Sequence, residues 1–341
     1  MRFLVTGGCG FIGSHLVDLL LDYGHKVVVL DALSWGSNIY NLRKHKLIGG
    51  ISGQRVPVMP KDDLVVMVGD VADAELVKAI VGEVVPDGVF HLAAQTHVDR
   101  SYGDVRPFVD SNMVGAYSVL EAVREYQGVR CIFMSTDEVY GDVTGFSHEN
   151  DPLAPRNVYS ALKAGGDILA QTYAAIFGCD IVIARPANNY GPRQFEEKLI
   201  PKILKEMLPA RDRKRAGAIP VYGDGQQIRD WLYVKDTALG LWHLFEAGKK
   251  GSIYNLGAHQ FQTVLQVIQA IGDMLGLHWE DHVQYTKDRI RGDRRYALDL
   301  SKTTEELGWV AATKFKKGLE ATVEWYATEY EMKKAEKAVQ A

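Results

Sequence analysis

Cysteines, long hydrophobic runs and targeting signals are scarce or lacking in this sequence. Its 341 residues contain three cysteines, Cys9, Cys131 and Cys179, without the spacing of a metal site or the even number of a disulfide framework. No apolar run approaches the roughly 20 residues that a membrane-spanning helix needs. We recognise no signal peptide before the first apolar segment. We therefore expect a cytoplasmic protein that holds no metal and contacts no membrane.

The sequence also lacks a strong excess of charge of either sign. Its 39 Lys and Arg against 43 Asp and Glu give a net charge of −4. This balance gives no electrostatic reason to expect binding to nucleic acid or to an anionic membrane. Hydrophobic residues make up 47% of the chain, and the length allows two closely joined globular domains.

Short apolar runs alternate with amphipathic helical patterns through the first half of the chain. The runs predict strands at 3–6, 26–30, 64–68, 88–92, 129–135 and 180–184. The helical patterns lie at 12–22, 74–81, 107–126 and 158–177. This alternation is typical of βαβ units, so we expect an α/β fold with a doubly wound, parallel, Rossmann-type sheet. Residues 49–63, rich in proline and glycine, should form a surface loop.

The alternation is lost after residue 185, which predicts a smaller C-terminal α+β domain for the substrate. We assign 1–185 to the cofactor domain and 186–341 mainly to the second domain, and expect about 226–255 to return to the first. Residues 188–192 have turn composition. Further helices are expected near 199–208, 263–275 and 303–307, and from about 319 onward.

A basic run at 211–215 falls in an expected loop between 208 and 220. Such a run is more often a solvated surface than a phosphate contact, and both interpretations stay open.

A glycine-rich segment, Gly-Gly-Cys-Gly-Phe-Ile-Gly at 7–13, follows a predicted strand and opens a predicted helix. Gly7 allows a tight turn, Gly10 lets the backbone approach a pyrophosphate, and Gly13 permits close packing of helix on strand. The helix N-terminus offers free N–H groups to phosphates. Asp31 ends the second strand, where its carboxylate can bind ribose hydroxyls and repel a 2′-phosphate. The pattern predicts an NAD site; the alternative is that the glycines only form a turn.

Tyr159 and Lys163 are four residues apart on a predicted helix and therefore share one face. The ammonium group should lower the pKa of the phenol and make Tyr159 a usable base. Asp137 and Glu138 follow the strand that ends at Ser135, and hydride abstraction alone does not need them. Adjacent side chains on a regular strand point to opposite faces, so both acids reach one substrate only if the chain turns irregularly there. The pair indicates a second reaction; an isolated acid pair would more commonly be a solvated turn.

Together these motifs resemble the extended short-chain dehydrogenase/reductase family over nearly the whole chain. Within it, five segments are similar to those of dTDP-glucose 4,6-dehydratases: STDEVYG at 135–141, NNYGP at 188–192, EKLIP at 197–201, YGDGQQIRDWLYV at 222–234 and DRRYALD at 293–299. Sugar-nucleotide 4-epimerases usually have small neutral residues in place of Asp137 and Glu138. UDP-glucuronate decarboxylases typically keep the glutamate but not the aspartate.

The resemblance implies a hydro-lyase that uses NAD to convert a nucleoside diphosphate glucose into its 4-keto-6-deoxy form. Its implied catalytic residues are Thr136, Asp137, Glu138, Tyr159 and Lys163. The implied NAD contacts, besides Tyr159 and Lys163, are Gly7, Gly10, Phe11, Ile12, Gly13, Asp31, Ala32, Leu33, Ser34, Asp70, Val71, Leu92, Ala93, Ala94, Ser111 and Asn189. The implied substrate contacts are Thr96, Thr136, Asn188, Lys198, Leu199, Pro220, Val221, Tyr222, Arg229, Asn255, Asp288 and Arg289.

Several of these assignments have alternatives. Lys198 and Arg229 can neutralise a pyrophosphate, but each polar residue taken singly could equally have a surface or capping role. Asp70 could instead be a helix N-terminal residue. The resemblance also implies a homodimer through the helices near 107–126 and 158–177, whose apolar faces could equally pack inside the domain.

The sequence departs from the family pattern at three places, and the second and third of them leave the base of the nucleotide open between thymine, uracil, cytosine and guanine. Gln95 replaces the usual glutamate, Ile-Arg-Gly at 290–292 replaces Pro-Gly-His, and the basic run at 211–215 is longer than expected. The nearest alternative function is a 4-epimerase or another NAD-dependent nucleotide-sugar enzyme. A non-catalytic nucleotide-binding module on the same fold is the more distant one.

Overall fold

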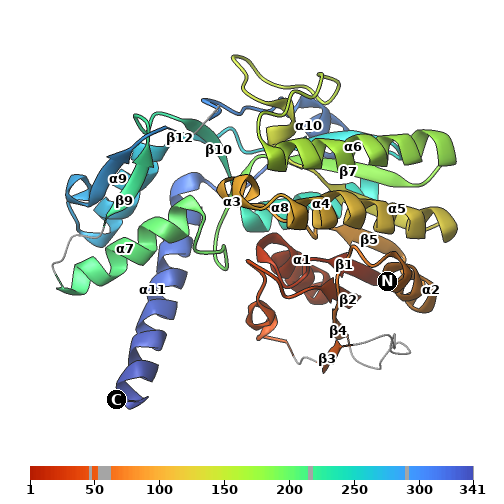
Figure 1. The fold of residues 1–341 in the computed structure, drawn as a ribbon, viewed down its shortest axis with the longest axis horizontal. Helices are drawn as coiled ribbons and strands as arrows, with labels where there is room; N and C mark the ends of the chain where they lie inside the picture. Colours follow the sequence, from red (N-terminus) through yellow and green to blue (C-terminus); the bar gives the residue numbers. More distant parts are fainter. Residues whose placement is uncertain (46–47, 53–62, 214–217, 289–291, 341) are drawn as a thin grey trace.

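A parallel sheet of eight strands, in the order β11-β7-β6-β5-β1-β2-β4-β3, forms the centre of the computed structural model. The structure describes residues 1–45, 48–52, 63–213, 218–288 and 292–340 (Figure 1). The strands are β1 Arg2–Thr6, β2 Lys26–Asp31, β3 Ile48–Ser52, β4 Leu64–Val68, β5 Gly88–His91, β6 Arg130–Met134, β7 Ile181–Pro186 and β11 Ile253–Leu256. The predicted α/β fold with a doubly wound parallel sheet is therefore confirmed.

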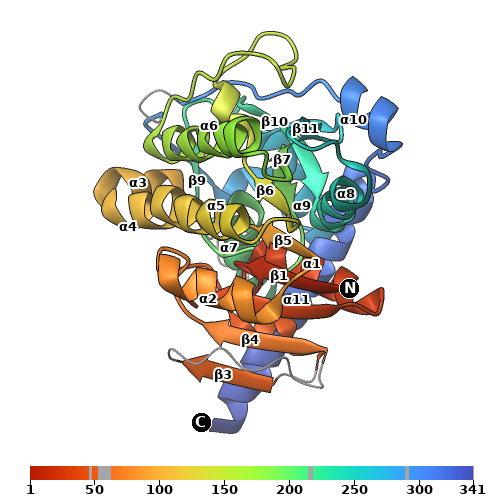
Figure 2. The same ribbon diagram turned by 90° about the vertical axis from the view of Figure 1, so that its right-hand side faces the viewer.

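Helices cover both faces of this sheet (Figure 2). Helices α1 (Phe11–Asp22) and α8 (Val234–Ala247) lie on one face, and α2 (Ala74–Val84), α5 (Gly115–Glu125) and α6 (Val158–Phe177) lie on the other. The alternation of strand side chains decides which core each residue joins. In β1, Phe3 and Val5 pack with α1 and α8, whereas Leu4 packs with α2 and α5. Burial on both faces explains why these strands are apolar at nearly every position.

The predicted strands and helices of this half are confirmed, with two corrections. Residues 48–52, which overlap the expected loop, form the edge strand β3 along β4; residues 53–62 lie outside the described part. The helix expected over 107–126 is instead α4 (Arg106–Val109), a π-helical turn at Asp110–Val114 and then α5. A π-helical turn inserts an extra residue into the helix and is frequent at functional sites.

The C-terminal region builds the predicted smaller α+β unit. Strands β8 (Asn188–Tyr190), β10 (Ile228–Tyr233) and β12 (Phe261–Thr263) form one sheet, and β9 (Ile219–Tyr222) pairs with β13 (Val283–Thr286). Helices α7 (Leu199–Arg213), α9 (Val264–Leu275) and α11 (Phe315–Gln340) surround a third core. The segment with α8 and β11 returns to the large sheet, and α10 (Ser301–Leu307) lies beside it.

Three expectations for this region need correction. Residues 188–190 form strand β8 instead of a turn, because they pair with β10. Helix α7 continues past the predicted end at 208 to Arg213, so Arg211 lies on a helix, where it pairs with Glu331. Residues 214–217 lie outside the described part. Helix α11 begins at Phe315, before the expected 319, and extends away from the body of the protein (Figure 1).

None of the described helices combines the length and the apolar character needed to cross a membrane.

Candidate active site

The predicted cofactor residues lie where successive strands of the large sheet end. Because the strands are parallel, their carboxyl ends share one edge. The strand order reverses between β1 and β5, and ligands of open α/β sheets bind at such a switch point. The loop after β1 meets the loop after β5 there: a Cβ built on Gly7 would stand 2.8 Å from the Ala93 backbone.

The glycine loop has the predicted backbone geometry. Gly7 adopts a φ of +72°, and a Cβ on Gly13 would stand 2.1 Å from the Gly7 carbonyl oxygen. Both positions therefore require glycine. A Cβ on Gly10 would meet only the Gly7 oxygen, at 3.1 Å, so the space around that position is otherwise open among the described residues. Gly10 caps α1 without a side-chain hydrogen bond, and Phe11 and Ile12 begin the helix. This cradle fits the pyrophosphate of a dinucleotide.

Asp31 holds the glycine loop to the loop after β2. Its buried carboxylate accepts hydrogen bonds from the Cys9 and Leu33 backbone N–H groups, both at 2.9 Å, and from the Ser37 hydroxyl at 2.7 Å. Burial raises the pKa of Asp31, and these hydrogen bonds oppose the shift. An ionised carboxylate has about four acceptor positions. One position is thus left for a ribose hydroxyl, which fits the predicted NAD site.

The loops after β4 and β5 supply the next predicted contacts. Asp70 is exposed, and its carboxylate accepts the Ala72 N–H at 2.9 Å. The N-cap of α2 is Asp73, so the alternative that Asp70 caps this helix is wrong. Val71 is buried against Gly115 of α5. Of the remaining predicted contacts here, Leu33, Leu92, Ala93 and Ala94 are half-buried, whereas Ala32 and Ser34 are exposed.

Asn112, in the π-helical turn, is a site residue that sequence reasoning missed. It is 2% exposed; its amide oxygen accepts the Gln95 N–H at 2.8 Å and its amide nitrogen donates to the Gln95 oxygen at 3.0 Å. The Gln95 side chain donates to the Ser34 hydroxyl at 3.3 Å. The π-helical turn, which also carries Ser111, thereby joins the loops after β5 and β2. A polar residue on the buried face of a predicted helix was the available signal.

The chain turns irregularly after Ser135, as the acid pair requires. Thr136 caps the 3-10 helix η3 (Asp137–Tyr140), and its hydroxyl accepts the Glu138 N–H at 3.3 Å. The same hydroxyl donates to the Asp137 carboxyl at 3.2 Å. Glu138 is half-buried and accepts a hydrogen bond at 3.2 Å from the side chain of Asn157, another missed residue, which caps α6. The condition under which both acids can reach one substrate, an irregular turn after Ser135, is therefore met.

Tyr159 stands in the first turn of α6 beside this acid pair. Its phenol is buried and hydrogen-bonds with Thr136, and it lies within the electrostatic influence of Glu138 and Asp137. Lys163 follows one turn later and donates to the Met134 carbonyl at 2.6 Å, at the end of β6. The predicted catalytic residues therefore come from the turn after β6, from η3 and from α6.

Burial and charge set the protonation states of these groups. Burial, followed by the negative charge of Glu138, raises the pKa of Asp137 to about 8, while the positive charge of Arg229 opposes the shift. At neutral pH Asp137 is therefore mostly protonated. Burial lowers the pKa of Lys163 to about 8, against the influence of Asp167.

The expectation that Lys163 lowers the pKa of Tyr159 is wrong for the protein itself. Burial, and then the charge of Glu138, raise the pKa of Tyr159 above its ordinary value. The hydrogen bond with Thr136 opposes this shift only in part. The Lys163 ammonium group instead donates a hydrogen bond to the Met134 carbonyl.

Two predicted substrate contacts, Lys198 and Thr96, are hydrogen-bonded to each other. Lys198, just before α7, donates from Nζ to the Thr96 carbonyl at 2.7 Å. Arg229 donates to the Ile228 and Asp293 carbonyls and stacks on the ring of Tyr296, 4.4 Å from its centroid.

Tyr296 is a further residue that sequence reasoning did not select. It is buried, hydrogen-bonds to the Asp293 carboxyl, and has a pKa raised by burial and by the charge of Glu138. Its position in the family-like DRRYALD segment was the available signal.

The other predicted substrate residues are more dispersed. Asn188 on β8, Leu199 at the start of α7, and Pro220 and Tyr222 on β9 are half-buried, whereas Val221 faces the third core. Asp288 lies beside Gly223, next to the end of β9. Arg289 lies outside the described residues.

Two asparagines predicted to contact ligands have side chains that are hydrogen-bonded within the protein. Asn189 donates to the Ala187 carbonyl and hydrogen-bonds to Thr237. Asn255 is 0% exposed, and its amide binds the Tyr140 hydroxyl and two backbone carbonyls.

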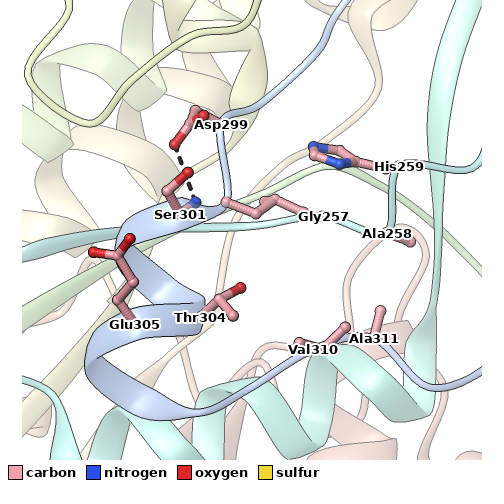
Figure 3. A pocket seen from close by; sticks show the side chains of 10 residues that line it. Gly257, Ala258, His259, Asp299, Ser301, Thr304, Glu305, Val310 and Ala311 are labelled. Carbon is pink, nitrogen blue, oxygen red and sulfur yellow. Dashed lines mark hydrogen bonds between the residues drawn. The ribbon is translucent and has the colours of Figure 1, made fainter.

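A hollow of about 410 Å³ lies elsewhere, between the loop after β11 and α10 (Figure 3). Its lining includes Gly257, His259, Asp299, Thr304 and Val310 and none of the predicted site residues.

Comparison with known proteins agrees with this geometry. The family model described as GDP-mannose 4,6 dehydratase matches residues 4–322. The chain belongs to this family. A dTDP-glucose 4,6-dehydratase of Actinoplanes sp. is 40% identical over 96% of this chain and 98% of its own.

Two solved structures show how far the family likeness extends. The structure of DesIV, a dTDP-glucose 4,6-dehydratase of Streptomyces venezuelae with NAD and TYD bound, has a TM-score of 0.86 and 36% identity, covering 97% of this chain and 98% of its own. UDP-glucose 4-epimerase of Thermotoga maritima has a TM-score of 0.85 at 29% identity, covering 97% and 100%. The resemblance inferred from the sequence motifs is thus confirmed, and the fold alone does not separate the two activities.

A first prediction concerns how the stability of this protein depends on the protonation of Asp137. The Asp137→Asn variant should be more stable than the wild type by roughly 3 to 5 kcal/mol at pH 8, because it removes the cost of ionising a buried carboxyl. In the unfolded chain Asp137 has an ordinary pKa of 3.8, whereas burial raises its pKa to about 8 in the folded protein. The wild type therefore loses stability as pH rises between these values. Denaturant unfolding of both proteins from pH 4 to 9 measures the difference; a difference independent of pH would contradict the buried, protonated state.

A second prediction concerns the glycine cradle. Gly13→Ala should reduce the NAD that copurifies with the protein, because the new Cβ would overlap the Gly7 carbonyl oxygen. Gly24→Ala is the matched control: Gly24 has a φ of +75° and open space around it, so alanine should cost about 1 kcal/mol of stability and leave NAD in place. Calorimetric titration with NAD checks both variants, and equal NAD affinity in Gly13→Ala and wild type would refute the cradle.

Proposed function

We propose that this chain dehydrates a nucleoside diphosphate glucose, in the first place dTDP-glucose, to the 4-keto-6-deoxy sugar. One observation carries the proposal: two adjacent carboxyls, one buried with a pKa raised by that burial and one half-buried, lie beside Tyr159 after the end of β6. An acid and a base with such different environments suit an elimination reaction. The names of the Actinoplanes and Streptomyces relatives support the same reaction.

The proposal includes NAD, held by the glycine loop and Asp31. Bound NAD would accept the C4 hydride of the sugar and later return it to C6, and its positively charged ring would favour the Tyr159 phenolate. The Ser135 hydroxyl, at the end of β6, supports a ligand here: it is buried and has no hydrogen-bond partner within the described residues.

The residues of the chain move the protons. Tyr159, hydrogen-bonded with Thr136, takes the proton of the C4 hydroxyl as C4 becomes a ketone. The ketone acidifies the neighbouring C5–H, and Glu138 removes that proton. Hydroxide is a poor leaving group, so Asp137 donates its proton to the C6 oxygen, which leaves as water. A proton returns to C5, and the net change is the loss of one water.

The substrate residues fit a nucleoside diphosphate in outline. Lys198 and Arg229 supply positive charge for the pyrophosphate, although both also donate hydrogen bonds to backbone carbonyls. Tyr222 and Asp288 lie together near the ends of β9 and β13, where the base would bind.

Two alternatives are retained. The epimerase-like fold allows a 4-epimerase, but an epimerase needs no acid pair. A UDP-, CDP- or GDP-sugar could replace the dTDP-sugar, and the family model is named for a GDP-sugar enzyme. Mass spectrometry after incubation with a panel of nucleoside diphosphate hexoses decides both: dehydration lowers the product mass by one water, and epimerisation leaves it unchanged. No reaction with any sugar would favour a non-catalytic nucleotide-binding module.

A third prediction tests the two carboxyls. Glu138→Gln and Asp137→Asn should each keep slow reduction of NAD by the substrate, because Tyr159 and Lys163 are intact. Each should slow water elimination roughly a hundredfold or more, since general acid–base catalysis contributes about that much. Absorbance of reduced NAD follows the first step and product mass the second. Full dehydration by the double variant would reject both assignments.

The proposal further includes a homodimer in the cytoplasm. Helices α5 and α6 lie side by side, and both expose large apolar side chains. Exposed side chains there include Val114 just before α5, Tyr117 on α5, and Ile168 and Ile176 on α6, which are 38%, 47%, 53% and 70% exposed. A second copy could cover this apolar face. Three buried free cysteines support a reducing compartment.

A fourth prediction tests the dimer. Ile168→Glu should convert a dimer to a monomer, because a charge in the centre of an apolar interface is left unpaired. Met332→Glu, at a residue of α11 with 51% exposure, is the matched control and should leave the mass unchanged. Light scattering after size-exclusion chromatography gives the masses. A wild-type monomer, or an Ile168→Glu dimer as stable as the wild type, would contradict the interface.

A further inference from the structure

A buried polar network connects the acid pair with α6, and the proposed proton transfers do not use it. Asp167 and Arg185 are 0% and 1% exposed and share two hydrogen bonds of 2.9 Å. Arg185 also donates to the Tyr140 hydroxyl at 2.8 Å, and Tyr140 donates to the Asn255 amide oxygen at 2.9 Å. We call Asp167, Arg185, Tyr140 and Asn255 the Arg185 network.

The two ends of the Arg185 network lie in the two halves of the catalytic machinery. Asp167 follows Tyr159 and Lys163 on α6 at successive intervals of four residues, so all three share one helix face. Tyr140 ends the 3-10 helix that begins with Asp137. A side chain of β7, Arg185, therefore links the helix that carries the base to the turn that carries the acids.

Stability alone is a poor explanation for such an ion pair. Removing two charges from water costs about as much as their attraction returns, and apolar side chains of similar volume often serve a core equally well. A planar guanidinium instead fixes the directions of several partners at once. Arg185 does so for Asp167, for Tyr140, and for the Glu149 carbonyl at 3.0 Å. The network is thus suited to setting geometry.

The 3-10 helix is also fixed where it ends. Gly141 follows Tyr140 with a φ of +73°, and a Cβ there would stand 2.3 Å from the Ala154 oxygen. Tyr140 is itself 5% exposed, with the Arg185 guanidinium 4.8 Å from its ring centroid. Besides the hydrogen bonds Asn157–Glu138 and Thr136–Tyr159, the Tyr140 hydroxyl is therefore a further point at which the turn of the acid pair is held, through Arg185 to α6 and through Asn255 to β11.

We propose that the Arg185 network positions the acid pair relative to Tyr159 and Lys163, with Tyr140 as its positioning residue, so that water elimination keeps pace with C4 oxidation. The proposal rests on the proposed dehydratase function. Tyr159 and Lys163 are also held independently, by the Asn157 cap of α6 and by the Met134 carbonyl. Loosening Tyr140 should therefore affect elimination far more than oxidation.

The test is Tyr140→Phe, which removes one hydroxyl and both of its hydrogen bonds. With dTDP-glucose as the probe, overall turnover should fall roughly tenfold to a hundredfold, the range that small misplacements of catalytic groups produce. Reduced cofactor should accumulate during turnover, because C4 oxidation is then faster than water elimination. Rapid-mixing absorbance measures reduced cofactor, and quenched samples measured by mass give the water loss.

Tyr254→Phe is the matched control. Tyr254 on β11 is also buried, and its hydroxyl is also hydrogen-bonded within the protein, donating to Glu306 and accepting from the Lys249 N–H. This variant should keep wild-type turnover within about twofold and accumulate no reduced cofactor. Thermal unfolding of both variants reports the purely structural loss, which should be similar in the two.

Several outcomes would overturn the inference. If turnover of Tyr140→Phe is unchanged, or falls without accumulation of reduced cofactor, the network does not position the acids. If Tyr140→Phe fails to fold, Arg185→Lys decides, because it keeps a cation beside Asp167 but loses the planar link to Tyr140; it must show the same accumulation. Absence of dehydration by the wild type would instead overturn the proposed function, and this inference with it.

Discussion

The account depends on the unequal burial of two adjacent carboxyl groups. Asp137 is enclosed by protein while Glu138 is half-buried and hydrogen-bonded to Asn157. Burial and the neighbouring negative charge keep Asp137 protonated at a pH where an ordinary aspartate is ionised. A donor and an acceptor of protons thus coexist at consecutive positions. The large sheet, the glycine cradle and α6 serve to present a sugar and a cofactor to this pair.

The local backbone makes this arrangement possible. Had β6 continued as a strand, Asp137 and Glu138 would point to opposite faces. Thr136 ends the strand: its hydroxyl caps the 3-10 helix, donates to Asp137 and hydrogen-bonds with Tyr159. One small side chain therefore sets the turn and connects the acids to the phenol. The same burial, followed by the negative charge of Glu138, raises the pKa of Tyr159 in the protein itself.

Sequence reasoning reached most of the sheet and the centre of the site, for identifiable reasons. Strand β4 and helix α6 begin and end where apolar periodicity and the flanking residues predicted. Edge strand β3 was missed because it pairs on one side only and contains two glycines, and β8 because Asn188 and Asn189 have turn composition that pairing with β10 overrides. Likewise, no sequence pattern reveals that the Asn255 amide is hydrogen-bonded inside the protein. Nor does one reveal that burial raises the pKa of Tyr159 although Lys163 lies one turn away.

The most direct test of the central claim is the protonation state of Asp137 itself. Infrared difference spectra between the wild type and Asp137→Asn, recorded across pH, isolate the stretching band of this one carboxyl. The account predicts a protonated carboxyl band at pH 6 to 7 that disappears with a midpoint near 8. A carboxylate band already complete at pH 6 would contradict the account, because Asp137 would then have no proton to give to the leaving oxygen.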